Sequence, residues 1–254
     1  ARYFDACNGF DPRDPYSLPA VGGWEVGLGT ADLAGRTVAI VPDLGTARVR
    51  PEVADLVDEA GRQLARDAGL RVVDLDPVLP PLGGEWAVAG MVGLLADLGE
   101  LYPDCEGDLT DEVRLGLAIS FDRFNLRRAA SIERYRRVLN EAMATMFDVA
   151  DFVVASTNPD VAFAAEGPPP LTVGGVDLVS ELGLTRAAMN NAALTACSNL
   201  TGNPAASIPV GSVDGLPVGM QVLARHHAEP DLLDLALAVE RARPWAKVAP
   251  GSPS

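Results

Sequence analysis

Apolar residues near the start of the chain change from short runs to a helical stripe and back, and this pattern predicts a β-α-β unit. A short apolar run within residues 36–43 is typical of a buried strand. Pro51 stands where a helix can begin, because the first turn does not use the N–H that proline lacks, and Gly69 marks the end of the apolar stripe. Residues 71–74 form the second strand, so the two strands should run parallel with a right-handed connection.

Helical periodicity dominates the middle of the chain. It covers residues 85–102 and 111–150, and the longer stretch is interpreted as two helices that meet near residues 130–131. A short apolar run at residues 152–155 predicts another buried strand. After a segment rich in Pro and Gly, a further helix is expected near residues 184–199.

The last third of the chain carries the clearest pattern of strands. Residues 205–210 and 218–223 are apolar runs joined by a loop with the turn signal Asp-Gly at residues 214–215. These two strands should therefore pair antiparallel. Pro230 then begins an amphipathic helix, which stops at Pro244 because proline cannot continue it.

The first residues of the chain show neither the periodicity of a helix nor that of a strand. They are rich in Gly, Pro and Asp, which is typical of an ordered arm on the surface. No internal repeat or linker divides the rest of the sequence. We therefore expect a single unit over residues 1–254, made of a surface arm at 1–35 and an α/β core at 36–254 in which covering helices pack on a mixed sheet.

Length and charge limit the possible partners. With 254 residues, 48% of them hydrophobic, the chain can bury a full core without a metal or a disulfide. The net charge of -15 repels the phosphates of nucleic acids and the headgroups of anionic membranes, so neither is predicted as a partner.

The cysteines and the apolar segments bear on location. Cys7, Cys105 and Cys197 are odd in number and widely separated, unlike a disulfide framework or a zinc site. No apolar run is long enough for a signal sequence or a spanning helix. A cytoplasmic protein is expected. The first residue is not Met, which suggests a start inside a longer reading frame, although removal of Met or a trimmed tag would leave the same trace.

No group of residues in the sequence assembles a nucleophile with a base. A Gly-x-Ser-x-Gly elbow, a Ser-x-x-Lys motif and a Gly-Gly-Ser-Ser-Gly stretch are all absent from the sequence, and its one lysine is Lys247, near the C-terminus. Asp74 and Asp76 could in principle act as an acid–base pair, but they follow a strand into a proline, where turn-forming Asp is common. No catalytic residue is therefore predicted.

Metal and cofactor sites are not predicted either. His226 and His227 are neighbours on one loop, and their side chains should diverge, so one zinc ion would not take both as ligands. Gly27 and Gly29 resemble the start of a dinucleotide-binding fingerprint. The third glycine and the preceding strand of that fingerprint are missing from the sequence.

Two motifs near the end of the chain carry a resemblance to a known family. Residues 199–211, which read Asn-Leu-Thr-Gly-Asn-Pro-Ala-Ala-Ser-Ile-Pro-Val-Gly, and residues 214–221, which read Asp-Gly-Leu-Pro-Val-Gly-Met-Gln, are similar to the C-terminal motif of the amidase-signature family. Residues 11–17 resemble the segment after that family's catalytic core, residues 151–159 its later strand, and residues 232–245 its closing helix. The resemblance thus spans the whole chain.

Part of this motif has an architectural reason. Gly202 and Pro204 should stop a helix and turn the chain into the sheet, and Gly219 should allow a neighbouring strand to approach closely.

The resemblance implies an activity and a pocket. Members of the family have a mixed sheet wrapped by helices and hydrolyse amides through an acyl-enzyme, with a lysine and two serines on a Gly- and Ser-rich stretch. These residues belong to the part of the family that precedes Ala1, so none can be carried over to this chain. The resemblance does imply that Thr157, Asn158, Asn199 and Thr201 line the substrate pocket, with capping or turn hydrogen bonds as the alternative role of each.

Two hypotheses follow. The first is the C-terminal portion of an amidase, inactive alone, which acts on a small amide when its N-terminal half is supplied. The second is a non-catalytic remnant that serves as a binding or self-association module and forms a homodimer through an exposed sheet edge. A complete enzyme with an unrecognised site is a third and less favoured interpretation.

Overall fold

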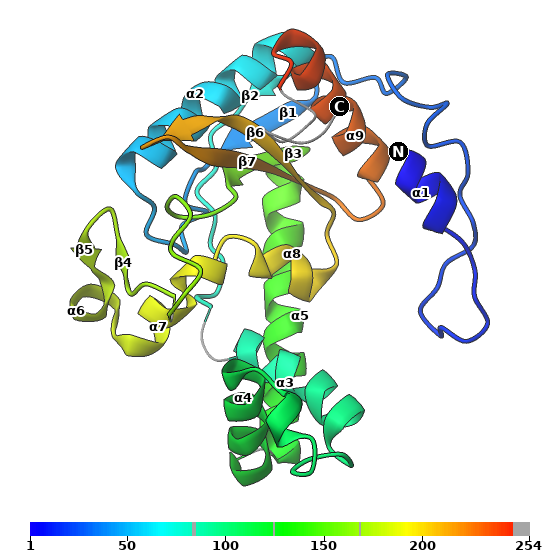
Figure 1. Ribbon diagram of the computed structural model, residues 1–254. Helices are drawn as coiled ribbons and strands as arrows, with labels where there is room; N and C mark the ends of the chain where they lie inside the picture. Colours follow the sequence, from blue (N-terminus) through cyan, green and yellow to red (C-terminus); the bar gives the residue numbers. More distant parts are fainter. Residues whose placement is uncertain (83–84, 124, 168, 246–254) are drawn as a thin grey trace, which may run out of the picture.

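A five-stranded sheet forms the centre of the computed structural model, which describes residues 1–82, 85–123, 125–167 and 169–245 (Figure 1). The strands lie in the order β2-β1-β3-β7-β6. Their bounds are Thr37–Ile40 for β1, Arg71–Val72 for β2, Phe152–Ser156 for β3, Ala205–Val213 for β6 and Leu216–Ala224 for β7. β1 runs parallel to β2 and β3, whereas β7 is antiparallel to β3 and β6. The expected mixed sheet is confirmed.

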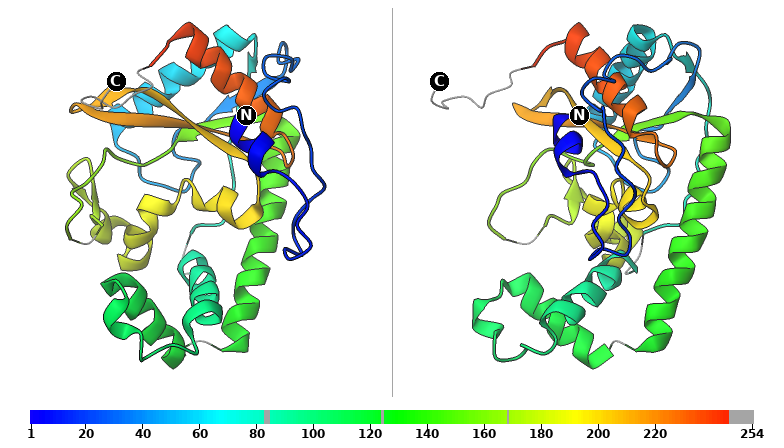
Figure 2. Two further views of the ribbon diagram at one scale, coloured as in Figure 1. Left: turned by 45° about the vertical axis from the view of Figure 1, so that its right-hand side comes forward. Right: turned by 90° about the vertical axis from the view of Figure 1, so that its right-hand side faces the viewer.

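Helices cover both faces of this sheet. The helices are α1 (Arg2–Cys7), α2 (Pro51–Ala68), α3 (Glu85–Leu98), α4 (Asp111–Arg123), α5 (Leu126–Val149), α6 (Leu178–Leu182), α7 (Leu184–Met189), α8 (Ala196–Thr201) and α9 (Glu229–Ala242). Short 3-10 turns lie at Glu106–Asp108 and Asn190–Ala192, and β4 (Thr172–Val173) pairs with β5 (Val176–Asp177) in a separate hairpin. α2 and α9 pack on one face of the sheet, and α5 and α8 pack on the other (Figures 1 and 2).

The predicted β-α-β unit is present. α2 begins at Pro51 and ends where Gly69 adopts a left-handed conformation with a φ of 67°, which only glycine takes at little cost. Gly61 lets this helix approach the sheet, because a Cβ there would lie 3.1 Å from the Val154 side chain and 3.2 Å from that of Ile40. β1 and β2 pair parallel, as expected for strands joined through a helix.

Several helix boundaries differ from the prediction, and α3 ends at Leu98 rather than at residue 102. α5 begins after Asn125, and not near residues 130–131 as predicted. The Asn125 side chain caps this helix by accepting a hydrogen bond from the Arg128 main-chain N–H at 3.0 Å. The helix expected near residues 184–199 is divided into α7, a 3-10 turn and α8. The buried side chain of Asn190 lies at this division and binds the main chain of Arg48.

The N-terminal arm is held against the last helix. It contains α1, which the sequence pattern did not predict, and otherwise follows an irregular path over the surface (Figure 2). The carboxylate of Asp234 on α9 is 6% exposed and accepts hydrogen bonds from the N–H groups of Gly29 at 2.6 Å and Ala31 at 2.7 Å. One buried acid therefore fixes the end of the arm.

Asp151, at the start of β3, fixes β3 against β1. Its carboxylate accepts hydrogen bonds from the N–H and the hydroxyl of Thr37 at 2.8 and 2.9 Å. Burial by itself would raise the pKa of Asp151, but these hydrogen bonds, together with nearby Arg225 and Arg36, hold that pKa below its usual range. Asp151 is therefore a structural anion.

β7 carries a notch at Gly219. The hydroxyls of Ser207 on β6 and Thr157, just after β3, meet above this glycine at an Oγ–Oγ1 distance of 2.7 Å. A Cβ placed on Gly219 would lie 2.8 Å from each of the two oxygens. The close approach expected at Gly219 is confirmed, and it joins two strands that are not neighbours in the sheet.

β6 forms an outer edge of the sheet. Along it, Ala206, Ile208 and Val210 pack among the side chains of α2 and α9, whereas Ala205 and Ser207 are exposed on the other face. The Asp-Gly turn that joins β6 to β7 is present as predicted, with positive φ angles at both residues. In the part of the chain that the structure describes, no helix is both long and apolar enough to cross a membrane.

Replacing Asp234 with Ala should release the arm. Because two main-chain N–H groups would lose their acceptor, we expect the free energy of unfolding to fall by about 1–2 kcal/mol and the arm to be cleaved faster in limited proteolysis. Urea unfolding and a proteolysis time course measure both effects. Asp55→Ala, at an exposed position of α2, is the control and should change stability by less than about 0.5 kcal/mol. An unchanged cleavage rate for Asp234→Ala would contradict the anchoring role.

Replacing Gly219 with Ala should separate the hydroxyls of Thr157 and Ser207. We expect a loss of about 1–3 kcal/mol in the free energy of unfolding, because the new methyl group would overlap both oxygens. Adding Ser207→Gly to this variant removes one of the two oxygens and should restore part of the loss. Gly22→Ala, where a Cβ has no neighbour within 4 Å, serves as the control. Equal stability of Gly219→Ala and the wild type would show that the notch is not required.

Candidate functional site

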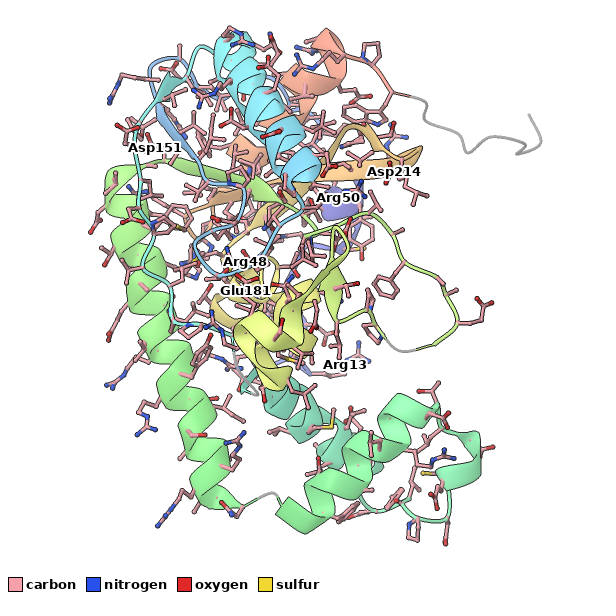
Figure 3. The ribbon with its side chains drawn as sticks, turned by 90° about the vertical axis from the view of Figure 1, so that its left-hand side faces the viewer. Arg13, Arg48, Arg50, Asp151, Glu181 and Asp214 are labelled. Atoms are coloured by element: carbon pink, nitrogen blue, oxygen red, sulfur yellow. The ribbon has the colours of Figure 1, made fainter. Side chains whose placement is uncertain are left out.

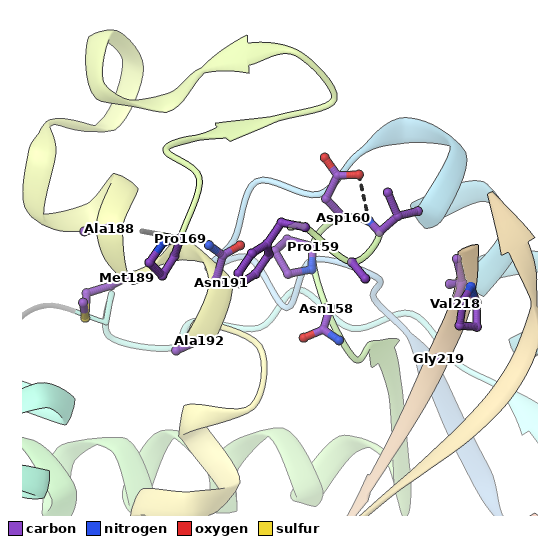
Figure 4. A pocket seen from close by; sticks show the side chains of 14 residues that line it. Asn158, Pro159, Asp160, Pro169, Ala188, Met189, Asn191, Ala192, Val218 and Gly219 are labelled. Carbon is purple, nitrogen blue, oxygen red and sulfur yellow. Dashed lines mark hydrogen bonds between the residues drawn. The ribbon is translucent and has the colours of Figure 1, made fainter. Parts of the chain in front are cut away.

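A cavity of about 710 Å³ lies beyond the C-terminal end of β3 (Figure 4). One wall is the loop after β3 together with the start of β7, and the other is the segment that leads through α7 to the following 3-10 turn. The lining residues are Asn158, Pro159, Asp160, Val161, Ala162, Phe163, Pro169, Ala188, Met189, Asn191, Ala192, Pro217, Val218 and Gly219. Clefts at the carboxyl ends of strands are common ligand sites in α/β proteins.

Arg50 fixes the first wall. Its N–H donates a hydrogen bond to the Pro159 carbonyl at 2.8 Å. Its guanidinium group, 16% exposed, lies 2.7 Å from the Asp214 carboxylate and 3.5 Å from that of Asp160. Hydrogen bonds donated to Glu52 and to Asp214 raise the pKa of Arg50 above its already high ordinary value. The arginine thus ties the cavity loop to the β6–β7 turn, and Figure 3 shows Arg50 beside Asp214.

Asn190 fixes the second wall. Its side-chain oxygen accepts a hydrogen bond from the Arg48 N–H at 2.8 Å, and its side-chain nitrogen donates one to the Arg48 carbonyl at 2.9 Å. The Arg48 side chain forms an ion pair with Glu181 on α6 (Figure 3). Because Asn190 is only 2% exposed, these bonds replace water on both of its polar atoms. The segment before α2 therefore holds both walls of the cavity.

Sequence reasoning did not identify Arg48, Arg50 or Asn190. Their partners lie far along the chain, so no local pattern connects them. The only sequence signal was the position of Arg50 directly before the helix-starting Pro51.

One of the four residues predicted to line a pocket, Asn158, is in the lining of this cavity, and Thr157 lies beside that lining. Asn158 lines it directly and its side chain is exposed. Thr157 lies next to the lining residue Gly219, to whose carbonyl the Thr157 N–H donates a hydrogen bond at 2.9 Å. The hydroxyl of Thr157 is already paired with that of Ser207, a contact between two strands that differs from the capping or turn hydrogen bond named as its alternative role.

Asn199 and Thr201 are both on α8, outside the described lining of this cavity. The Asn199 side chain donates a hydrogen bond to the Thr195 carbonyl at 3.1 Å. The Thr201 hydroxyl donates one to the Cys197 carbonyl at 2.9 Å. Both contacts are of the local kind named as the alternative, and a pocket-lining role for the two residues stays a prediction.

The remaining candidate groups lie apart from the cavity lining. Burial raises the pKa of the Cys197 thiol, which lowers its reactivity. His226 and His227 are exposed, with ring centroids 6.4 Å apart, and the Nε2 of His226 is bonded to the Thr201 carbonyl. Asp74 and Asp76 are both exposed.

Lys247 lies outside the described residues. Within residues 1–82, 85–123, 125–167 and 169–245, no three His, Cys, Asp or Glu side chains gather in a way that could hold a metal ion.

Comparison with known proteins identifies relatives of the same kind along the whole chain. This chain is 25% identical over 252 residues to the acylamidase of Rhodococcus erythropolis. The alignment covers 98% of this chain and 51% of the acylamidase. This chain is also 32% identical over 223 residues to the putative amidase AmiC of Mycobacterium leprae (strain TN). That alignment covers 84% of this chain and 45% of AmiC.

A solved structure shares the fold. A bacterial aryl acylamidase of the amidase-signature family matches with a TM-score of 0.75 and 24% identity, over 93% of this chain and 49% of that chain. The chain therefore spans about half the length of the relatives it matches. The model of the Amidase family matches residues 1–233. The chain belongs to this family, the amidase-signature hydrolases.

Proposed function

We propose that this chain is the C-terminal portion of an amidase, which hydrolyses a small carboxylic amide through an acyl-enzyme once an N-terminal portion is supplied. The observation that carries the proposal is the match to the Amidase family along residues 1–233, combined with coverage of only about half of each relative. The lysine and two serines that the family resemblance implies would come from the N-terminal portion.

In this proposal the chain contributes the sheet and one side of the substrate pocket. Acyl transfer needs a nucleophile beside a base and donors for the developing oxyanion. The hydroxyls of Ser207 and Thr157 lie beside the lining residue Gly219, and each is the partner of the other, so neither is paired there with a base. The cavity walls fixed by Arg50 and Asn190 would hold the acyl or amine group while the other portion performs the chemistry.

The proposal is tested by complementation. The chain is purified alone and also co-produced with an amidase-signature N-terminal portion that carries the Gly- and Ser-rich stretch. Each sample is treated with a fluorophosphonate, its intact mass is measured, and hydrolysis of a simple aromatic amide is followed. We expect no adduct and no turnover for the chain alone. The combined sample should show an adduct on the N-terminal portion and turnover at least about a hundredfold above that of either portion.

The N-terminal portion alone is the control, because it shows whether this chain is required. A covalent adduct on this chain alone, accompanied by turnover, would mean that it carries its own nucleophile and would overturn the proposal.

A second candidate function is self-association through β6. The strand has nine residues and forms an edge of the sheet, whereas the other edge, β2, has two. A long edge strand presents main-chain groups that can pair with another chain. The same edge could pair with an N-terminal portion, so the two candidates compete for one surface.

Self-association predicts a dimer whose population depends on concentration. Ser212 is exposed near the end of β6, and Ser212→Lys should weaken the dimer about tenfold, because charged edge positions oppose strand pairing. Sedimentation equilibrium measures the effect. Ser180→Lys, at an exposed position of α6, changes the net charge equally and should leave the dimer intact. A wild-type chain that stays monomeric at high concentration would exclude this candidate.

A further inference from the structure

We propose that the cavity beside Gly219 binds an uncharged amide with an apolar body and discriminates against ligands that carry a carboxylate. The inference deepens the proposed function, on which it rests in taking the ligand as the substrate. It depends on three features of the cavity, namely its apolar walls, its two asparagine side chains and the state of the charged groups around it.

The walls suit an apolar group. Val161, Phe163, Met189 and Val218 come from both sides of the cavity, and its volume is typical of sites for small molecules. Phe163 is 53% exposed although it lines the cavity, so a ligand could cover apolar surface that is now in contact with water. Burial of this surface favours an aryl or alkyl body.

The uncharged polar side chains in the lining are both carboxamides. Asn158 follows β3, and Asn191 lies in the 3-10 turn after α7, so the two come from opposite walls (Figure 4). Each side chain has a carbonyl acceptor and an amino donor, which complement the N–H and carbonyl of an amide ligand. Asn191 donates one hydrogen bond to the Pro170 carbonyl at 3.4 Å, and this leaves its oxygen available.

The charged groups at the cavity are already paired. The Asp160 carboxylate accepts hydrogen bonds from the Val161 N–H at 2.8 Å and the Gly174 N–H at 2.7 Å, and it also faces Arg50. Asp160 is the one charged residue in the described lining of the cavity. That lining therefore offers no cation to a ligand carboxylate.

The arginines that hold the cavity walls are committed elsewhere. Arg50 is paired with Asp214 and Glu52, and Arg48 with Glu181. A carboxylate in this cavity would lose water without gaining a counter-ion, which is strongly unfavourable. The net charge of -15 adds a general repulsion of anions. An uncharged amide meets neither obstacle.

The test uses the chain itself with ¹³C-methyl-labelled methionine, because Met189 lines the cavity. Two probes of similar shape are titrated: 4-methylbenzamide and 4-carbamoylbenzoate. We expect 4-methylbenzamide to shift the Met189 methyl signal in a saturable way, and the anionic 4-carbamoylbenzoate to bind at least about tenfold more weakly. The signal is assigned with Met189→Leu, a replacement of similar volume, and the signal of Met143, buried under the sheet, is the internal reference.

Two matched variants locate the site. Ala188→Phe places a ring in the cavity from an exposed helical position and should weaken the binding of 4-methylbenzamide more than about tenfold. Ala130→Phe is the same change at an exposed position of α5, outside this lining, and should leave binding unchanged. Equal effects of the two variants would overturn the assignment of the site.

Equal affinity for the neutral and the anionic probe, or no saturable shift of Met189 with any probe, would overturn the inference. These outcomes are separate from the test of the proposed function, because adduct formation in the combined sample depends on the supplied nucleophile. If the adduct and turnover appear but the neutral probe has no advantage, only the ligand class is wrong. If the neutral probe binds selectively but no combination is ever labelled, the cavity is a binding site and the proposed function fails.

Discussion

The sheet and the helices that cover its two faces are arranged around β3, whose five residues are all buried. This strand pairs parallel with β1 on one side and antiparallel with β7 on the other, so its main-chain groups are satisfied within the sheet. Phe152 and Val154 face α2 and α9, while Val153 and Ala155 face α5 and α8. A strand buried in this way needs two helical layers, and its end is a natural place for a cavity because the chain must leave the sheet there.

The strands and helices around β3 could be predicted from the sequence wherever the residues that specify them are neighbours in the chain. The apolar runs at β1, β3, β6 and β7, the proline at the start of α2 and the Asp-Gly turn each depend on neighbouring residues alone. The division of the region near residues 184–199 was not accessible, because it depends on Asn190 meeting the main chain of Arg48. The boundary at Asn125 was available as a capping signal, but the continuing helical pattern obscured it.

The candidate site shows the same limit. The family resemblance directed attention to Thr157 and Asn158; Asn158 is among the residues that line the cavity, and Thr157 lies beside the lining residue Gly219. The residues that hold the walls were missed, since Arg50 meets partners on two distant segments, at Asp160 and Asp214. The match to the Amidase family identifies the family of the chain, but it does not identify these contacts.

The contact between the N-terminal arm and α9 has a consequence for the order of folding. Gly29 and Asp234 are 205 residues apart in the sequence, so closing this contact carries the entropy cost of a long loop. During synthesis the arm leaves the ribosome well before α9, which carries its acceptor. The arm can therefore dock only after the intervening residues and α9 have been made, so its docking depends on the completion of a helix that lies far from it in the sequence.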